Sequence, residues 1–204
     1  MVCTVARLYE ELRDLAALLA GLIAGSGARG LKLDEANMLA YHLGRRLGRA
    51  ERWGFRATPE GPRSDAVEKI LDELIDAGVL TWRFEPGSIQ DPFYAIVEPE
   101  AVEWIPSTEE YRIGFEEGDR LFHRARLSRL ELIGYIYLLH PDAWSEKPER
   151  LERLKARIAA RLVAKGVLEL REAARLTGMG EDEMARLVEE AREEVELGLP
   201  LEEE

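Results

Sequence analysis

The amino-acid sequence predicts a mainly α-helical protein with minor β structure. Apolar residues recur at spacings of three and four over most of the 204 residues, which is the period of an amphipathic helix. Residues suited to begin a helix, such as Ser64 and Ser128, precede several of these segments, and glycines such as Gly78 follow them. Residues 79–84 and 93–97 have strand character, so we expect the β structure to form a hairpin.

Composition narrows the class of protein. The chain is 46% hydrophobic and 33% charged, and its apolar runs fall short of the ~18 to 20 residues that a membrane span needs. A single cysteine, Cys3, and acidic residues within the first fourteen favour a soluble cytoplasmic protein over a secreted one. One Asn and one Gln beside 40 acidic residues are typical of a thermophile. The length fits one or two domains.

The first predicted helix covers residues 5–23 and ends in a glycine-rich segment. Its apolar stripe could pack on the core of its own chain or pair two copies as a homodimer, because the spacing also fits three coiled-coil heptads. Core packing is favoured, since three heptads are few. Residues 25–30 match the pattern G-x-G-x-x-G, but a helix precedes them where a dinucleotide site requires a strand. We therefore interpret them as a helix end and a linker.

The remaining elements of residues 1–105 follow in order. Asp34 is expected to cap a helix that runs to about Arg52, and the chain then turns at residues 53–54. Residues 59–62 form a turn-rich break. Ser64 should cap a third helix that ends at Gly78, and residues 86–92 should connect the two strands. The predicted order of three helices followed by a β-hairpin is that of a winged helix.

Residues 106–204 are predicted as a second, all-helical domain, with the boundary at residues 99–107. Ser128 and Glu131 form a capping box, and the helix that they begin is apolar nearly all the way round, so it should be the buried centre of this half. Ser145 should open another helix that Gly166 closes. Residues 170–177 and 181–195 supply two more, and residues 151–197 then form a helix-turn-helix-like unit.

Two segments carry resemblances to known families. Residues 34–97 resemble the winged-helix domain of YwgA-like and Panacea-type proteins, in the segments 39–44, 61–64 and 77–80, with Arg63 where those families have an aromatic residue. Residues 172–187 resemble a helix-turn-helix, with Gly180 where Ser or Thr commonly caps the second helix. The segment that contains them, which begins at Leu151 and ends in residues 198–201, is similar to small prokaryotic proteins of which some are described as antitoxins. The resemblances imply a regulatory or toxin-antitoxin setting and bring no catalytic chemistry.

Six arginines form the candidate site, which we call the arginine ridge. Its members are Arg45, Arg46, Arg49, Arg52, Arg56 and Arg63. On a continuous helix Arg45, Arg49 and Arg52 would share one face, a geometry suited to a row of phosphates. The alternative is a solvated face paired with acids such as Glu51 and Glu60.

Other charges argue against inserting either candidate recognition helix into DNA. The third helix is acidic, and residues 167–204 hold four basic and thirteen acidic residues. Like charges facing phosphates lower affinity. The whole chain has a net charge of −12. A basic protein partner at the acidic C-terminal helices therefore competes with DNA as the expected partner.

The sequence predicts no catalytic residues, no metal site and no cofactor. His42, His123 and His140 lack a familiar metal-ligand spacing, and the serines lack a nucleophile elbow or phosphate loop. The prediction is a non-enzymatic DNA-associated regulator that contacts phosphates through the arginine ridge. The alternative is a protein-protein interaction module, antitoxin-like or an adaptor, whose folds have lost DNA contact. A homodimer through residues 5–23 is also predicted, because regulators of palindromic sites are commonly twofold.

Overall fold

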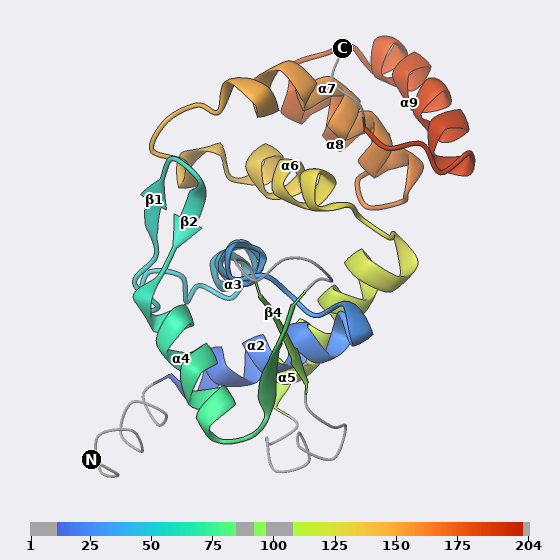
Figure 1. Ribbon diagram of the computed structural model, residues 1–204. Helices are drawn as coiled ribbons and strands as arrows, with labels where there is room; N and C mark the ends of the chain where they lie inside the picture. Colours follow the sequence, from blue (N-terminus) through green and yellow to red (C-terminus); the bar gives the residue numbers. More distant parts are fainter. Residues whose placement is uncertain (1–11, 85–91, 97–107, 202–204) are drawn as a thin grey trace. The chain divides into compact units, whose positions relative to one another are not determined.

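The structure, a computed structural model, describes residues 12–84, 92–96 and 108–201 (Figure 1). The chain divides into two compact units. Unit 1 comprises residues 1–56 and 62–124, and unit 2 comprises residues 57–61 and 125–204. Helices dominate and the strands are short, so the predicted mainly α class with minor β is confirmed. In the described ranges no helix is both long enough and apolar enough to cross a bilayer.

Unit 1 contains most of the β structure. Its elements in chain order are α2 (Arg13–Gly25), the short helix η1 (Gly27–Arg29), α3 (Leu33–Arg46), β1 (Arg56–Thr58), β2 (Gly61–Arg63), α4 (Asp65–Asp76), β3 (Leu80–Arg83), β4 (Phe93–Ile96), α5 (Glu109–Gly118) and the π-helix η3 (Asp119–Arg124). Strands β3 and β4 pair antiparallel from Leu80 opposite Ile96 to Arg83 opposite Phe93, as predicted. Leu31 adds a β-bridge to Tyr94.

Helix α2 forms the centre of unit 1. Every residue from Leu15 to Ile23 is buried, so the helix is covered on all sides and has no single buried stripe. The covering elements include α3, α4, α5 and β4. This packing within one chain agrees with the favoured interpretation of the segment. The start of the predicted stripe, residues 5–11, lies outside the described residues.

Four glycines bring α2 and α5 into backbone contact. A Cβ atom on Gly21 or Gly25 would collide with a carbonyl oxygen of α5, and one on Gly114 or Gly118 would collide with a carbonyl oxygen of α2. In Figure 1 the two helices lie against each other within unit 1. Residues 109–124 therefore belong with unit 1, and the predicted division into 1–105 and 106–204 is wrong. The predicted boundary segment, residues 99–107, is not among the described residues.

Two helix boundaries and one hairpin differ from prediction. Helix α3 ends at Arg46, because Gly48 takes a left-handed φ of 68° and the Gly44 carbonyl accepts the backbone N–H groups of Arg49 and Ala50. Helix α3 also begins after Lys32, so Asp34 lies in its first turn. Within the predicted break at residues 59–62, residues 59–60 form the turn between β1 and β2, and residues 61–62 already belong to β2.

A buried hydrogen-bond chain fixes the start of α4. The Ser64 side chain accepts from Ala66 N–H at 3.1 Å, which confirms the predicted cap. Asn37 Oδ1 in turn accepts from Ser64 N–H at 2.8 Å, and the Ser64 hydroxyl donates to the Trp53 carbonyl. Asn37 and Ser64 are both buried. The chain's one asparagine therefore ties α3 to the first turn of α4.

Unit 2 is helical apart from its share of the β1–β2 hairpin. Its helices are α6 (Arg129–Leu139), η4 (Pro141–Ala143), α7 (Glu149–Ala164), α8 (Leu170–Thr177) and α9 (Glu181–Glu196). The Ser128–Glu131 capping box, the buried character of α6 and the helix limits at 170–177 are confirmed. Gly178 has the left-handed φ, 77°, of the turn before α9.

One helix of unit 2 begins later than predicted. Helix α7 starts at Glu149, after Pro148, and does not start at Ser145. A residue that precedes proline is disfavoured in the helical region, so Lys147 cannot readily continue a helix begun at Ser145. The Ser145 N–H donates instead to the Thr58 carbonyl at 3.1 Å, which holds residues 57–61 in unit 2.

Candidate functional site

The arginine ridge is divided between a helix and the chain that follows it. Arg45 and Arg46 lie in the last turn of α3, whereas Arg49 and Arg52 lie beyond the left-handed turn at Gly48. Because the helix ends at Arg46, Arg45 shares no helical face with Arg49 and Arg52. The expectation of one continuous basic face is wrong for this reason.

Arg49 and Arg52 bind acidic residues of neighbouring helices. Arg49 lies 2.9 Å from Asp14 of α2 and 2.5 Å from Glu110 of α5, and Arg52 also pairs with Asp14. Burial by itself would raise the pKa of Glu110, but hydrogen bonds from its own backbone and from Arg49 outweigh burial and lower that pKa. These two arginines therefore hold α2, α5 and the turn after α3 together.

Arg56 and Arg63 pair with the first turns of α4. The two terminal nitrogens of Arg56, Nη2 and Nη1, donate to the Asp65 carboxylate at 2.9 and 3.2 Å. The Arg63 guanidinium lies 3.5 Å from the Glu68 carboxylate. The hydrogen bond and charge of Asp65 raise the pKa of Arg56, while Arg56 lowers the pKa of Asp65. These pairs are exposed, so solvent screens them. Their charges are nevertheless partly compensated within the chain.

Arg45 and Arg46 are the exposed members of the ridge on α3. Arg45 donates to the Tyr41 hydroxyl at 3.3 Å and lies over the Tyr41 ring, 5.8 Å from its centroid. Within the described ranges Arg46 has no carboxylate at ion-pair distance. The predicted alternative of a ridge paired with acids holds for four arginines, although the partners are Asp14, Glu110, Asp65 and Glu68 and not the predicted Glu51 and Glu60.

Helix α4 presents acidic residues to solvent. Asp65, Asp72 and Asp76 are exposed beside Lys69, and its apolar residues Val67, Ile70, Leu71 and Leu74 are buried. Glu73 is half-buried, and burial followed by the charge of Asp76 raises its pKa. Strand β3 next to it exposes half of the Trp82 side chain. The side of α4 that faces water is therefore unsuited to phosphates.

A pocket of about 440 Å³ lies beside the end of α3. It is lined by Tyr41, Gly44, Arg45, Gly48, Ala50, Glu51 and Phe55. The Tyr41 and Phe55 rings meet edge to face with centroids 5.3 Å apart. The buried ring of Trp53 lies against Gly44, since a Cβ there would be 2.7 Å from that ring. The pocket thus combines aromatic walls with one cation and one anion.

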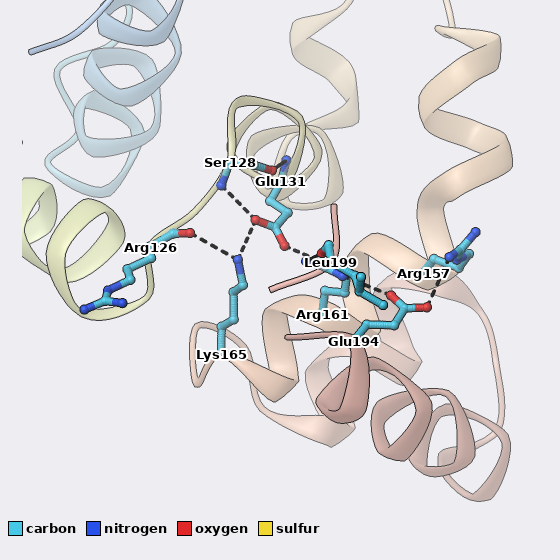
Figure 2. A network of polar contacts seen from close by, with 8 residues as sticks. All are labelled: Arg126, Ser128, Glu131, Arg157, Arg161, Lys165, Glu194 and Leu199. Carbon is cyan, nitrogen blue, oxygen red and sulfur yellow. Dashed lines mark hydrogen bonds and ion pairs between the residues drawn. The ribbon is translucent and has the colours of Figure 1, made fainter. Parts of the chain in front are cut away.

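A network of charged residues crosses the interior of unit 2 (Figure 2). Glu131 of α6 is fully buried and accepts from Arg161 Nε at 2.8 Å, from Lys165 Nζ at 2.7 Å and from Ser128 N–H at 2.8 Å. Burial by itself would raise the pKa of Glu131, but the hydrogen bonds from Lys165, Arg161 and Ser128 lower it. The network therefore keeps a buried carboxylate ionised.

The same network reaches the C-terminal helix and the segment after it. Arg161 donates to Glu194 of α9 at 2.9 Å and to the Leu199 carbonyl at 3.0 Å, and Arg157 reaches Glu194 at 3.2 Å (Figure 2). Lys165 also donates to the carbonyl of Arg126, whose φ of 49° is left-handed. Helix α9 is thereby anchored on α7 by ion pairs as well as by packing, and Arg161 of α7 links these pairs to Glu131 of α6.

The outer face of α9 is acidic. Asp182, Glu189, Glu193 and Glu196 are all exposed, and their spacings of seven, four and three place them on one side of the helix. The exposed Arg186 lies on this side as well, and Glu189 pairs with Arg192 at 2.5 Å, so the side carries a surplus of negative charge and is not purely acidic. Met184, Val188 and Ala191 are buried on the opposite side. We call the four carboxylates the acidic face of α9. Figure 2 shows that Glu194 of the same helix lies toward Arg157 and Arg161 instead.

The candidate metal ligands do not assemble into a site. Across the part of the chain that the structure describes, no three His, Cys, Asp or Glu side chains are placed to hold a metal ion. His42 is buried with its Nε2 atom 3.9 Å from Glu117, which also binds Arg120. This cluster lies inside unit 1.

Comparison of the chain with protein-family models, curated proteins and solved structures gives no significant match. The resemblances to YwgA-like, Panacea-type and antitoxin-like proteins therefore stay predictions.

Sequence reasoning missed the glycine contact and the Glu131 network. A signal existed for the first, because Gly21 and Gly25 have the same spacing of four as Gly114 and Gly118, a pattern that allows close helix approach. Apart from the predicted Ser128–Glu131 capping box, the network joins residues 30 or more positions apart, and no local pattern in the sequence indicates these pairings.

Proposed function

We propose that this chain is a non-enzymatic interaction protein that binds a basic protein segment on the acidic face of α9. The carrying observation is that the helix expected to contact DNA in a helix-turn-helix presents Asp182, Glu189, Glu193 and Glu196 to solvent. The four carboxylates outnumber Arg186 on this side and Arg192 beside it, so the net negative charge attracts a lysine- or arginine-rich segment and repels phosphates.

The rigidity of this face supports the proposal. Glu194 lies on α9 among the exposed carboxylates, yet it turns inward to Arg157 and Arg161 and so prevents the helix from rotating about its axis. A fixed row of charges loses little freedom on binding, which favours affinity and a defined register. Residues 151–197, predicted as helix-turn-helix-like, would thus keep that order of elements without DNA contact.

Unit 1 contributes a second degenerate module to this proposal. Helix α2, the Leu31 bridge, α3, α4 and the β3–β4 hairpin follow the order of a winged helix, with the β1–β2 hairpin inserted between α3 and α4. The recognition helix of that arrangement would be α4, whose exposed residues include Asp65, Asp72 and Asp76. An acidic recognition helix fits a protein partner better than a nucleic acid.

A binding titration tests the proposal. The probe is a helical peptide of repeating Lys and Ala, and the variant carries Asp182→Asn, Glu189→Gln and Glu193→Gln. We expect affinity at low salt to fall about tenfold, since three exposed charge pairs contribute up to about 0.5 kcal/mol each. The control carries Glu60→Gln, Asp72→Asn and Asp76→Asn, which remove the same charge from exposed positions outside α9. Equal weakening by both variants would show only general attraction, and the α9 proposal would fail.

DNA binding remains the second candidate function, through Arg45 and Arg46. Both are exposed in the last turn of α3, and Arg46 has no carboxylate partner among residues 12–84, 92–96 and 108–201. Two exposed arginines give a small electrostatic footprint in comparison with the six of the whole arginine ridge. Duplex binding that exceeds binding of the basic peptide would reverse the order of the two candidates.

A further inference from the structure

The pocket beside α3 has the size and chemistry of a small-molecule site. Its volume of about 440 Å³ falls within the roughly 300 to 1,000 Å³ typical of ligand pockets. Two of its lining residues are glycines, so part of its wall is bare backbone. Gly48 has a left-handed φ of 68°, and a Cβ there would meet nothing within 4 Å, so the backbone turn keeps this side open.

Arg45 supplies a positioned cation at this pocket. Its hydrogen bond to the Tyr41 hydroxyl and its position over the Tyr41 ring restrain a side chain that is otherwise flexible. A guanidinium presents several N–H donors in a planar fork, which matches the two oxygens of a carboxylate. The pocket can therefore orient a ligand carboxylate.

Glu51 supplies the opposite charge. It is an exposed lining residue, and an ionised carboxylate only accepts hydrogen bonds, so it suits an ammonium group. The third feature of the pocket is an aromatic wall. It is formed by Phe55, which is half-buried, and by Tyr41, whose ring meets Phe55 edge to face. Aromatic rings favour such offset and edge contacts with a further ring.

We propose that this pocket binds a free α-amino acid with an aromatic side chain. The carboxylate would pair with Arg45, the ammonium with Glu51, and the ring would lie against Phe55 and Tyr41. A purely anionic ligand would leave Glu51 facing a like charge, and a purely cationic one would face Arg45. The zwitterion is the class of ligand that uses both charges and the aromatic wall.

Calorimetric titration of the full chain tests the proposal with four probes. L-phenylalanine carries all three groups, 3-phenylpropionate lacks the ammonium, 2-phenylethylamine lacks the carboxylate, and L-alanine lacks the ring. We expect saturable binding of L-phenylalanine, with each other probe about tenfold weaker or worse, because one charge-assisted or aromatic contact is worth roughly that factor. Absence of L-phenylalanine binding at millimolar concentration, or tighter binding of 3-phenylpropionate, would overturn the proposal.

Matched variants assign the two charges. Arg45→Gln should weaken L-phenylalanine about tenfold but should not weaken 2-phenylethylamine, which has no carboxylate and is repelled by Arg45. Glu51→Gln should weaken L-phenylalanine but should not weaken 3-phenylpropionate, which has no ammonium group and is repelled by Glu51. Arg46→Gln, a neighbour outside the pocket lining, is the control for net charge. All three positions are exposed, so folding should persist and can be checked by thermal melting. Equal effects of Arg45→Gln and Arg46→Gln would reject the assignment.

Discussion

Asn37 Oδ1 accepts the backbone N–H of Ser64 at 2.8 Å, although 27 residues separate the two in the chain. The amide is buried, and its Nδ2 group donates to the Leu33 carbonyl at 3.0 Å. Both ends of the side chain are thus used, one within α3 and one at the start of α4. A thermolabile residue type that occurs once in the sequence is placed where few other side chains could make both bonds.

Asn37→Ala should lower the free energy of unfolding by about 1 to 3 kcal/mol. The substitution leaves the buried N–H of Ser64 without an acceptor, and an unsatisfied buried donor costs that much. Denaturant unfolding measures the change. Ser145→Ala serves as the control, because this serine is exposed and contributes its backbone N–H and not its side chain. A loss no larger than that of the control would show that water replaces the amide.

Gly21→Ala should destabilise unit 1 by about 1 to 3 kcal/mol or more. The added methyl group would collide with the Tyr111 carbonyl, so α2 and α5 would have to separate. Gly180→Ala is the matched control, because its φ is −70° and a Cβ there would meet nothing within 4 Å. Its cost should stay below about 1 kcal/mol. Thermal unfolding of both variants compares them, and equal stability would refute the close contact.

Arg161→Met should cost about 3 to 5 kcal/mol. Glu131 would remain buried with one cation fewer, and breaking a buried ion pair from one side has this effect. Exchanging Glu131→Leu together with Arg161→Met should recover part of the loss, because the fully buried carboxylate is then gone, while Lys165 keeps its bond to the Arg126 carbonyl and Glu194 keeps its bond to Arg157. Denaturant unfolding of the single and double variants compares their free energies of unfolding and so measures how far the effects of Glu131 and Arg161 depend on each other. A double variant less stable than the single one would contradict this account.

Stability should fall in acid partly through Glu131. Its pKa in the folded protein is lowered below the ordinary value of 4.5, so its contribution is present above that value and is lost as pH falls through the folded pKa. Glu131→Gln should therefore show a smaller loss of unfolding free energy between neutral pH and acid than the wild type does. Parallel denaturant curves along a pH series measure the difference, and identical pH slopes would rule out this contribution.

Tyr137 should titrate about two pH units above an ordinary tyrosine. Burial, followed by its hydrogen bond to Glu152 and the charge of that residue, raises the pKa of Tyr137 to about 12. Because the folded protein favours the neutral phenol, this shift adds to the free energy of unfolding. That contribution is complete below about pH 10 and is lost as pH rises towards 12. Absorbance titration of the wild type and of Tyr137→Phe isolates this group, and Glu152→Gln should lower its pKa. A normal titration midpoint would exclude the hydrogen bond.

The sequence by itself determined those features whose cause lies within a few residues. The capping box of Ser128 and Glu131 closes over three residues, and Gly178 takes its left-handed conformation because the chain must turn there before α9. The position of Ser64 before an apolar repeat likewise indicates a helix cap, which the structure has at the start of α4. Such interactions depend on local spacing, which is written in the order of the residues.

The tertiary structure decided which charges remain available and where the units divide. The distance of 61 residues between Arg49 and Glu110 hides their pairing from any local pattern, and so the arginine ridge could be predicted as a set of residues but not as a site. The end of α3 at Arg46 and the close approach of α2 and α5 have the same origin. Each depends on surfaces that come together only after the helices have formed, when packing and buried ion pairs outweigh local helix preference.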